Sequence, residues 1–209
     1  MPSAPVPPVM GVVLAGGLSR RMGGGDKPMR ILGGRTLLDR VVSRFAPQCA
    51  AGVILNLNGD ADRVPDFPGE IVPDGVPGHP GPLAGILAGL DHAAVHHPEV
   101  RHVASVSGDA PFLPPDLVAR LAAAARGDSI VMAASGAREH FTVALWPVAL
   151  RADLRHALVE REERRVGAFL RRHGAVAVSW PTEPLDPFMN INTPEDLAAA
   201  EAVLARLEP

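Results

Sequence analysis

The chain has 209 residues, the size of one large domain or two small ones at about 100–200 residues per domain. Apolar residues make up 47% of the sequence and charged residues 21%, so most of the chain can bury a core and is not intrinsically disordered. The formal net charge of −3 provides no basic field, which excludes a general nucleic-acid binder. No run of about 18 apolar residues occurs, and we therefore expect no membrane association.

Cysteine content and the amino terminus indicate the compartment. The single cysteine, Cys49, excludes an internal disulfide framework and is typical of a reducing environment. The first residues carry no basic segment followed by an apolar stretch, so no signal peptide is predicted and we expect a cytoplasmic protein. Residues 1–8, with four prolines, are predicted to form a flexible tail, and residues 9–209 a single domain.

Apolar runs alternate with amphipathic stretches along the rest of the chain. We predict strands at 9–14, 53–55, 70–72, 103–106, 130–134, 141–146 and 176–178, and helices at 36–46, 83–97, 115–126, 151–160, 164–173 and 194–207. The first strand is apolar on both faces, as in a buried parallel sheet. This order predicts an α/β fold with a doubly wound, mostly parallel sheet and helices on both faces. Ligands of such sheets bind beyond the carboxyl ends of the strands.

A glycine-rich loop follows the first predicted strand and contains an unusual cation. Lys27 is the only lysine among 20 basic residues, and it ends the segment Leu14-Ala-Gly-Gly-Leu-Ser-Arg-Arg-Met-Gly-Gly-Gly-Asp-Lys27. Glycines let backbone N–H groups approach an anion, and Arg20 and Arg21 add two further cations. A compact ammonium differs most from a guanidinium where it must meet a phosphate in close quarters. The loop therefore indicates a phosphate site, although it matches neither the Rossmann nor the Walker pattern.

The same segment resembles the signature of the molybdenum cofactor guanylyltransferases, which belong to the nucleotidyltransferase superfamily. The similarity continues in order along nearly the whole chain, through Asn56, Asp74, Gly81-Pro-Leu-Ala-Gly85, Ser107-Gly-Asp-Ala-Pro111 and Asn190-Ile-Asn-Thr-Pro194. The resemblance implies a Rossmann-like nucleotidyltransferase fold. It also implies transfer of GMP from GTP to the terminal phosphate of molybdopterin, with release of pyrophosphate.

Asp109 is the candidate metal ligand. It follows an apolar strand and precedes a proline, so its carboxylate is expected at the carboxyl edge of the sheet. Mg²⁺ is usually held by one or two carboxylates together with substrate phosphates, and we expect it as the cofactor here. The alternative is that Asp109 caps the helix that starts near Pro115, but Asp116 is better placed for that role.

The resemblance also assigns the two substrates to residues. It implies GTP binding by Leu14, Ala15, Gly16, Gly17, Lys27, Asn56, Asp74 and Asp109, with Lys27, Asp109 and Arg21 as the catalytic residues. An acidic acceptor suits guanine, whose N1–H and N2–H₂ are donors, and the sequence leaves open which of these residues reads the base. Asn190 and Asn192, two apart in an extended segment, face the same way and are assigned to molybdopterin, with Arg164 and Arg165 as possible helpers. For Asn56 the alternative is an ordinary turn residue, and for the asparagine pair it is local capping of the last helix. Thr193 and Pro194 predict where that helix starts.

Other readings remain open at this point. A related nucleotidyltransferase could use CTP or a sugar-phosphate acceptor, and a carrier could bind molybdopterin without catalysis. His92 and His96 have a spacing that can bind metal, but no glutamate or cysteine supports them, and a solvated helix end is the simpler reading. Cys49 is read as a bystander, and no Gly-x-Ser-x-Gly elbow supports a hydrolase. Contacts with molybdoenzymes or cofactor-assembly proteins are expected to be transient.

Overall fold

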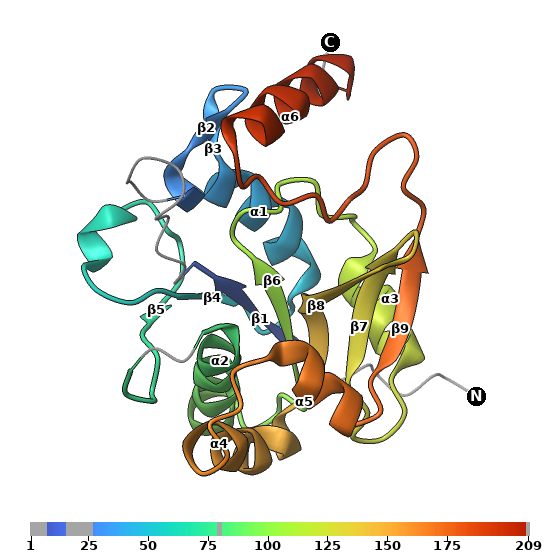
Figure 1. Ribbon diagram of the computed structural model, residues 1–209. Coiled ribbons are helices and arrows are strands. Elements are labelled where there is room, and N and C mark those ends of the chain that lie inside the picture. The colour runs from blue at the N-terminus through green and yellow to red at the C-terminus, as the bar shows by residue number, and fades with distance from the viewer. Residues whose placement is uncertain (1–7, 16–26, 79–80, 208–209) are drawn as a thin grey trace.

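The computed structural model describes residues 8–15, 27–78 and 81–207 of the chain. Its main sheet has seven strands, in the order β5 (Ile71–Val72), β4 (Val53–Asn56), β1 (Val9–Leu14), β6 (His102–Ser107), β8 (Arg138–Pro147), β7 (Val131–Ser135) and β9 (Val176–Trp180) (Figure 1). Neighbouring strands are parallel except that β8 runs antiparallel to both β6 and β7. The mostly parallel sheet that the sequence predicts is confirmed.

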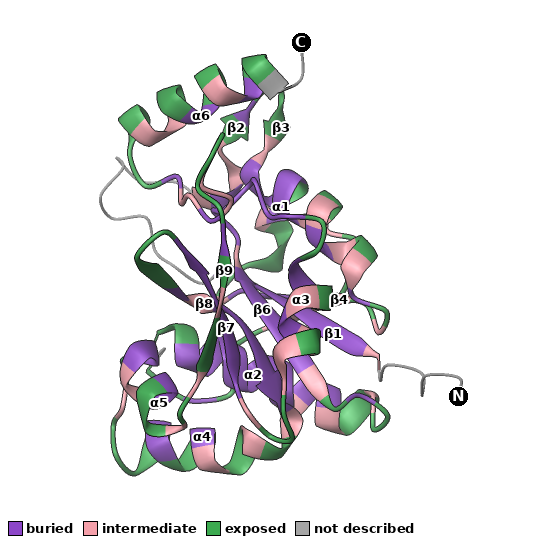
Figure 2. Ribbon diagram, turned by 90° about the vertical axis from the view of Figure 1, so that its right-hand side faces the viewer, coloured by how far each residue is buried: buried purple, intermediate pink, exposed green. Residues whose placement is uncertain are grey.

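Helices cover both faces of the sheet. One face packs against α1 (Leu37–Phe45) and α3 (Leu117–Ala124), and the other against α2 (Pro82–His96), α4 (Arg151–Val159) and α5 (Val166–Arg172). Consecutive side chains of β1 pack on opposite faces of the sheet, since Val13 belongs to the buried cluster on the first face and Val12 to the cluster on the second. Figure 2 shows that the central strands β1, β6 and β7 are almost wholly buried, whereas β9 is largely exposed. The sheet is therefore doubly wound, as predicted.

A third, smaller cluster joins the last helix to the region after the glycine-rich loop. It contains Leu32, Leu37, Phe112, Ile191, Ala200 and Leu204. Leu32 lies on the hairpin of β2 (Ile31–Leu32) and β3 (Arg35–Thr36), which contacts α6 (Pro194–Leu207) at the top of Figure 1. The remaining elements are single-turn 3₁₀ helices: η1 (Lys27–Met29), η2 (Ala46–Gln48), η3 (Ala61–Arg63) and η4 (Val148–Leu150). Through this cluster, segments that are far apart in the sequence meet beyond the sheet.

Capping boxes start two of the helices. In α1 the Thr36 hydroxyl accepts from the Asp39 backbone N–H at 2.9 Å, and the Asp39 carboxylate accepts from the Thr36 N–H at 3.3 Å. In α6 the Thr193 hydroxyl accepts from the Asp196 N–H at 3.1 Å, and Asp196 accepts from the Thr193 N–H at 2.9 Å. The predicted start of the last helix is confirmed.

The expectation for Asp116 is corrected. Asp116 does occupy the position before α3, but its side chain makes no capping hydrogen bond there. Its carboxylate instead accepts from the indole N–H of Trp180 at 2.9 Å, which ties α3 to the end of β9. A buried indole N–H needs an acceptor, and the sequence gives no sign that Trp180 lies next to this carboxylate.

The other differences concern boundaries. Strand β8 is longer than predicted, α3 and α5 are shorter, and the β2–β3 hairpin is not predicted at all. Two-residue strands are too short to show a period. Of the predicted tail at 1–8, only Pro8 lies in the described ranges. None of the helices in those ranges is long and apolar enough to span a bilayer.

Candidate active site

The carboxyl ends of three neighbouring strands form the floor of the candidate site. Leu14 of β1 is in register with Asn56 of β4 on one side and with Ser107 of β6 on the other. Just beyond, the Ala15 N–H donates to Asn56 O at 2.9 Å, and the Gly108 N–H donates to Leu14 O at 3.0 Å. Residues predicted for the nucleotide therefore lie on adjacent strands at one edge of the sheet.

Asp109 lies in the turn that ends β6 and is 9% exposed. The Ser107 hydroxyl donates to its Oδ1 at 2.5 Å, and the Lys27 ammonium contacts its Oδ2. Lys27 comes from η1, 82 positions earlier in the chain. The strand-end carboxylate and the only lysine of the sequence thus meet directly.

The Lys27 ammonium also contacts Asn192 Oδ1, across 165 positions of sequence. Two contacts hold Asn192 near it. The N–H of the preceding residue, Ile191, donates to Asp109 O at 2.9 Å, and the N–H of Asn192 itself donates to Asp196 Oδ2 at 2.8 Å. One cation therefore joins a residue predicted for GTP to a residue predicted for molybdopterin.

A second polar cluster lies on the β4 side of the same edge. Asn56, which is 3% exposed, donates through Nδ2 to Asp74 Oδ1 at 2.9 Å and to Val72 O at 3.1 Å. Asn58 donates to the other Asp74 oxygen at 2.8 Å and accepts from the Asp74 N–H at 2.9 Å. Both asparagines thus orient one carboxylate. Asn58 was not predicted as a site residue, although it lies only two positions after Asn56 and its side chain therefore shares the same side of an extended segment.

The start of α2 approaches this second cluster very closely. A Cβ built on Gly85 would lie 2.1 Å from Asn56 Oδ1 and 2.8 Å from a methyl group of Leu14. Only glycine fits at that position without moving the asparagine. Close packing against Asn56 and Leu14 therefore explains why the last residue of the Gly81–Gly85 motif is a glycine.

Comparison with known proteins identifies the family. Residues 11–176 match the model of the MobA-like NTP transferase domain. The chain belongs to this family. It is a nucleotidyltransferase, and the resemblance drawn from the sequence motifs is confirmed.

Curated relatives match the chain over nearly its whole length. A molybdenum cofactor guanylyltransferase from Bradyrhizobium sp. (strain ORS 278) is 54% identical over 207 residues, which are 98% of this chain and 97% of that protein. One from Nitrobacter hamburgensis is 52% identical over 202 residues, or 96% of each chain. Among solved structures, the molybdopterin-guanine dinucleotide biosynthesis protein A from Archaeoglobus fulgidus is 24% identical, with a TM-score of 0.72, over 94% of this chain and 99% of that one. These structures share the fold.

Several predicted residues of this MobA-like chain are not part of the described contacts. Gly16, Gly17, Arg20 and Arg21 lie outside the described residues. Arg164 and Arg165 are exposed between α4 and α5, and no contact among the described residues joins them to Lys27. Asn190 is half-buried on the segment that carries Asn192.

The histidines of α2 do not form a metal centre within the described ranges. The rings of His92 and His96 lie 4.5 Å apart and that of His97 lies 5.9 Å from His92, but no group of three metal-ligating side chains is found in the described part of the chain. His92 is buried rather than solvated, and burial lowers its pKa. Cys49 is also buried, which raises the pKa of its thiol to about 12 and keeps it protonated.

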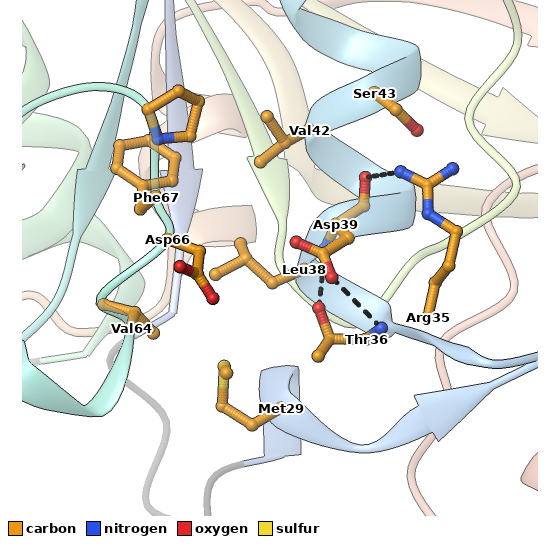
Figure 3. A pocket seen from close by; sticks show the side chains of 11 residues that line it. Met29, Arg35, Thr36, Leu38, Asp39, Val42, Ser43, Val64, Asp66 and Phe67 are labelled. Atoms are coloured by element: carbon orange, nitrogen blue, oxygen red, sulfur yellow. Dashed lines mark hydrogen bonds between the residues drawn. The ribbon is translucent and has the colours of Figure 1, made fainter.

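A pocket of about 240 Å³ lies beside η1 and α1 (Figure 3). Its apolar lining comes from Met29, Leu38, Val42, Val64 and Phe67. The Asp39 carboxylate on its wall belongs to the capping box of α1. None of the 11 residues that line this pocket is a predicted site residue, although Met29 lies in η1 together with Lys27.

Proposed function

We propose that this chain transfers the GMP group of GTP to the terminal phosphate of molybdopterin. A phosphate oxygen of molybdopterin forms a bond to the α-phosphorus of GTP, the bond from that phosphorus to the bridging oxygen breaks, and pyrophosphate leaves. The product is molybdopterin guanine dinucleotide. Full-length relatives at 54% and 52% identity with the name molybdenum cofactor guanylyltransferase support this assignment.

The contact of Lys27 with both Asp109 and Asn192 is the observation that carries the proposal. Two anionic reactants must approach each other, and their repulsion opposes the reaction. An ammonium between the two predicted substrate residues is placed to offset that repulsion, and its charge is not screened by bulk water to the usual extent because the side chain is 17% exposed.

The attacking phosphate is already anionic near neutral pH, so no strong general base is needed. What the chain supplies is positioning and charge stabilisation. When GTP binds, Lys27 exchanges its contacts with Asp109 and Asn192 for phosphate oxygens. Asn192 then presents a free amide to the acceptor, since amides both donate and accept hydrogen bonds.

Asp109 fits the requirements of a Mg²⁺ ligand. Its Oδ2 already faces a cation, the Lys27 ammonium, and Ser107 fixes the other oxygen. A single carboxylate is sufficient for Mg²⁺ when substrate phosphates complete the shell. When bound, the ion would neutralise charge on the phosphates.

Asp74 is the proposed acceptor for the guanine base. Asn56 and Asn58 orient its two oxygens, and a carboxylate only accepts hydrogen bonds, which matches the N1–H and N2–H₂ donors of guanine. The acceptor edge of cytosine would meet like partial charge there. We further infer that the protein acts in the cytoplasm and passes its product on through transient contacts with molybdoenzymes or cofactor-assembly proteins.

Removal of either charge at the Lys27–Asp109 pair tests the proposal. We expect Lys27→Ala and Asp109→Asn each to lower turnover by about 100-fold or more, the loss typical of a removed charge-stabilising group. The measurement is pyrophosphate release with GTP, molybdopterin and Mg²⁺. Asp91→Asn, which breaks an ion pair with Arg155 between α2 and α4, is the matched control and is expected to leave turnover unchanged.

Nucleotide titration separates the proposal from its alternatives. Calorimetry should show that the chain binds GTP in preference to CTP and ATP. Near-normal turnover by Lys27→Ala or Asp109→Asn would contradict the mechanism. Preference for CTP would indicate the related transferase. Molybdopterin binding without pyrophosphate release would indicate a carrier.

A further inference from the structure

A buried serine, a buried histidine and a half-buried aspartate meet at the carboxyl end of β7, outside the contacts described above. The Ser135 hydroxyl lies 2.6 Å from His140 Nε2 and donates to Asp186 Oδ1 at 2.8 Å. Ser135 is 2% exposed and His140 is 7% exposed. We call these three residues the Ser135 network.

The protons of the Ser135 network can be assigned from its chemistry. An ionised carboxylate only accepts, so the single proton of the hydroxyl goes to Asp186. The serine oxygen must then accept from His140, which places a proton on Nε2. Burial lowers the pKa of His140, although nearby Asp186 opposes this shift, so the ring is neutral near pH 7. Every polar group at the centre of the network is satisfied by this one arrangement.

This arrangement excludes nucleophilic catalysis by Ser135. In a catalytic triad the histidine accepts the serine proton and stands between serine and carboxylate. Here the hydroxyl stands in the middle, and the facing histidine nitrogen is a donor. The network therefore holds groups in place rather than activating one.

What the Ser135 network holds is the segment that follows Asp186. Asp186 Oδ1 also accepts from the Phe188 N–H at 3.0 Å, and the Asp186 carbonyl accepts from the Met189 N–H at 3.2 Å. The Phe188 ring is buried against His140, with ring centroids 4.8 Å apart, and meets Trp180 edge-on at 5.3 Å. The chain then runs directly into Asn190 and Asn192.

The segment from Asp186 to Asn192 is thus fixed at both ends. At its start the carboxylate is bonded to β7, and near its end Ile191 is bonded to the Asp109 carbonyl. Of the two asparagines proposed for the acceptor, Asn190 lies between these anchors and Asn192 directly follows the second. Release of the first anchor would leave the Lys27–Asp109 contact intact, because Lys27 and Asp109 reach the site through η1 and β6.

We infer that Ser135, His140 and Asp186 are positioning residues that set Asn190 and Asn192 for the acceptor molecule. The inference rests on the proposed function, since it concerns the second substrate of that reaction. Loss of the Ser135 network is therefore expected to raise KM for molybdopterin and to leave the affinity for GTP unchanged.

The test compares two substitutions at Asp186 with one at Ser135. Asp186→Ala removes the acceptor for both Ser135 and Phe188, and we expect KM for molybdopterin to rise by about 10-fold or more with kcat changed far less. Asp186→Asn keeps an oxygen that can accept both bonds and is expected to remain within about threefold of the parent. Ser135→Ala removes only the hydroxyl and should raise the same KM without the larger change in shape.

GTP binding by calorimetry, measured on the same variants without molybdopterin, distinguishes the possible failures. The dissociation constant for GTP is expected to stay within about twofold in all three. Equal weakening for both substrates, or an unchanged KM for molybdopterin in Ser135→Ala and Asp186→Ala, would overturn the positioning role. Failure of the parent protein to bind GTP or release pyrophosphate would instead count against the proposed function.

Discussion

At the scale of single residues, the candidate active site depends on a few side chains that have little freedom to move. Asp109 is held by Ser107 on one oxygen and meets Lys27 on the other, while Asp74 is held between Asn56 and Asn58. Such contacts place the charges before substrate arrives, so less reorganisation is needed during reaction. Near Asp74, the close approach of Gly85 to Asn56 leaves the asparagine little room to move.

Gly85→Ala should disturb that packing. The added methyl group would lie 2.1 Å from Asn56 Oδ1, so Asn56 must move and Asp74 loses the bond that it accepts from this asparagine. We expect stability to fall by about 1–3 kcal/mol from overpacking, and GTP affinity to fall by about 10-fold or more. For Gly89→Ala, one turn along the same helix, the nearest atoms belong to Val12 at 3.2 Å, and this variant is the matched control for affinity in calorimetry. Equal GTP affinity in the two variants would contradict a role for Gly85 in placing Asn56.

At the scale of elements, α6 links stability to the acceptor side. Its capping residue Asp196 accepts from the backbone N–H groups of both Asn192 and Thr193, so one carboxylate starts the helix and restrains a proposed site residue. The capping box of α1, formed by Thr36 and Asp39, has the same design without a proposed site residue inside it. The two capping boxes therefore allow a comparison in which a carboxylate of the same kind is removed with and without a proposed site residue beside it.

Asp196→Ala and Asp39→Ala should have similar effects on stability and different effects on activity. Each removes a capping carboxylate, for which we expect a loss of about 1 kcal/mol in the free energy of unfolding by urea. Only Asp196→Ala should raise KM for molybdopterin, because only Asp196 holds Asn192. If both variants raised that KM equally, general loosening of the fold would explain the result better than local restraint.

At the scale of the whole molecule, three histidines that are buried or half-buried couple folding to pH. Burial is the main cause that lowers the pKa of His92, His102 and His140 in the folded chain. The unfolded chain then binds protons first as pH falls through about 6.5, and stability decreases below that point. Stability from these groups is therefore fully present above pH 6.5.

We expect the free energy of unfolding to be lower at pH 5.5 than at pH 7.5, by at most about 1.4 kcal/mol per pH unit for each histidine. Urea denaturation at the two pH values measures it. His102→Gln, which removes one of these groups from the start of β6, should make the loss smaller. Equal stability at both pH values would contradict the direction of the shifts.

The fold could be predicted from the sequence because its signals are local. Runs such as 9–14 are apolar on both faces, and helices such as 194–207 begin with cap residues that can be recognised one by one. The antiparallel direction of β8 and the β2–β3 hairpin depend on tertiary pairing. Neither feature produces a hydrophobic periodicity that can be recognised in the sequence.

The candidate active site was only partly accessible to the same reasoning. Lys27, Asp109 and Asn192 were each identified from motifs, but no local pattern indicates that one ammonium meets both oxygens. Asn58 and Ser135 were missed because their role lies in holding another side chain, and such a role depends on contacts across 16 and 51 positions of sequence. Composition does not report on contacts at that range.

The contact of Lys27 with Asn192 has a consequence for the order in which a newly made chain becomes competent. Most of the sheet precedes position 180, whereas the asparagine that faces the ammonium is synthesised near the end. A growing polypeptide can therefore complete the strands that carry the proposed GTP-binding residues while Asn192, proposed for the acceptor, has not yet been synthesised. Premature termination before residue 190 would remove both Asn192 and the buried side chains Ile191, Ala200 and Leu204, so full-length synthesis is a condition for chemistry as well as for the third buried cluster.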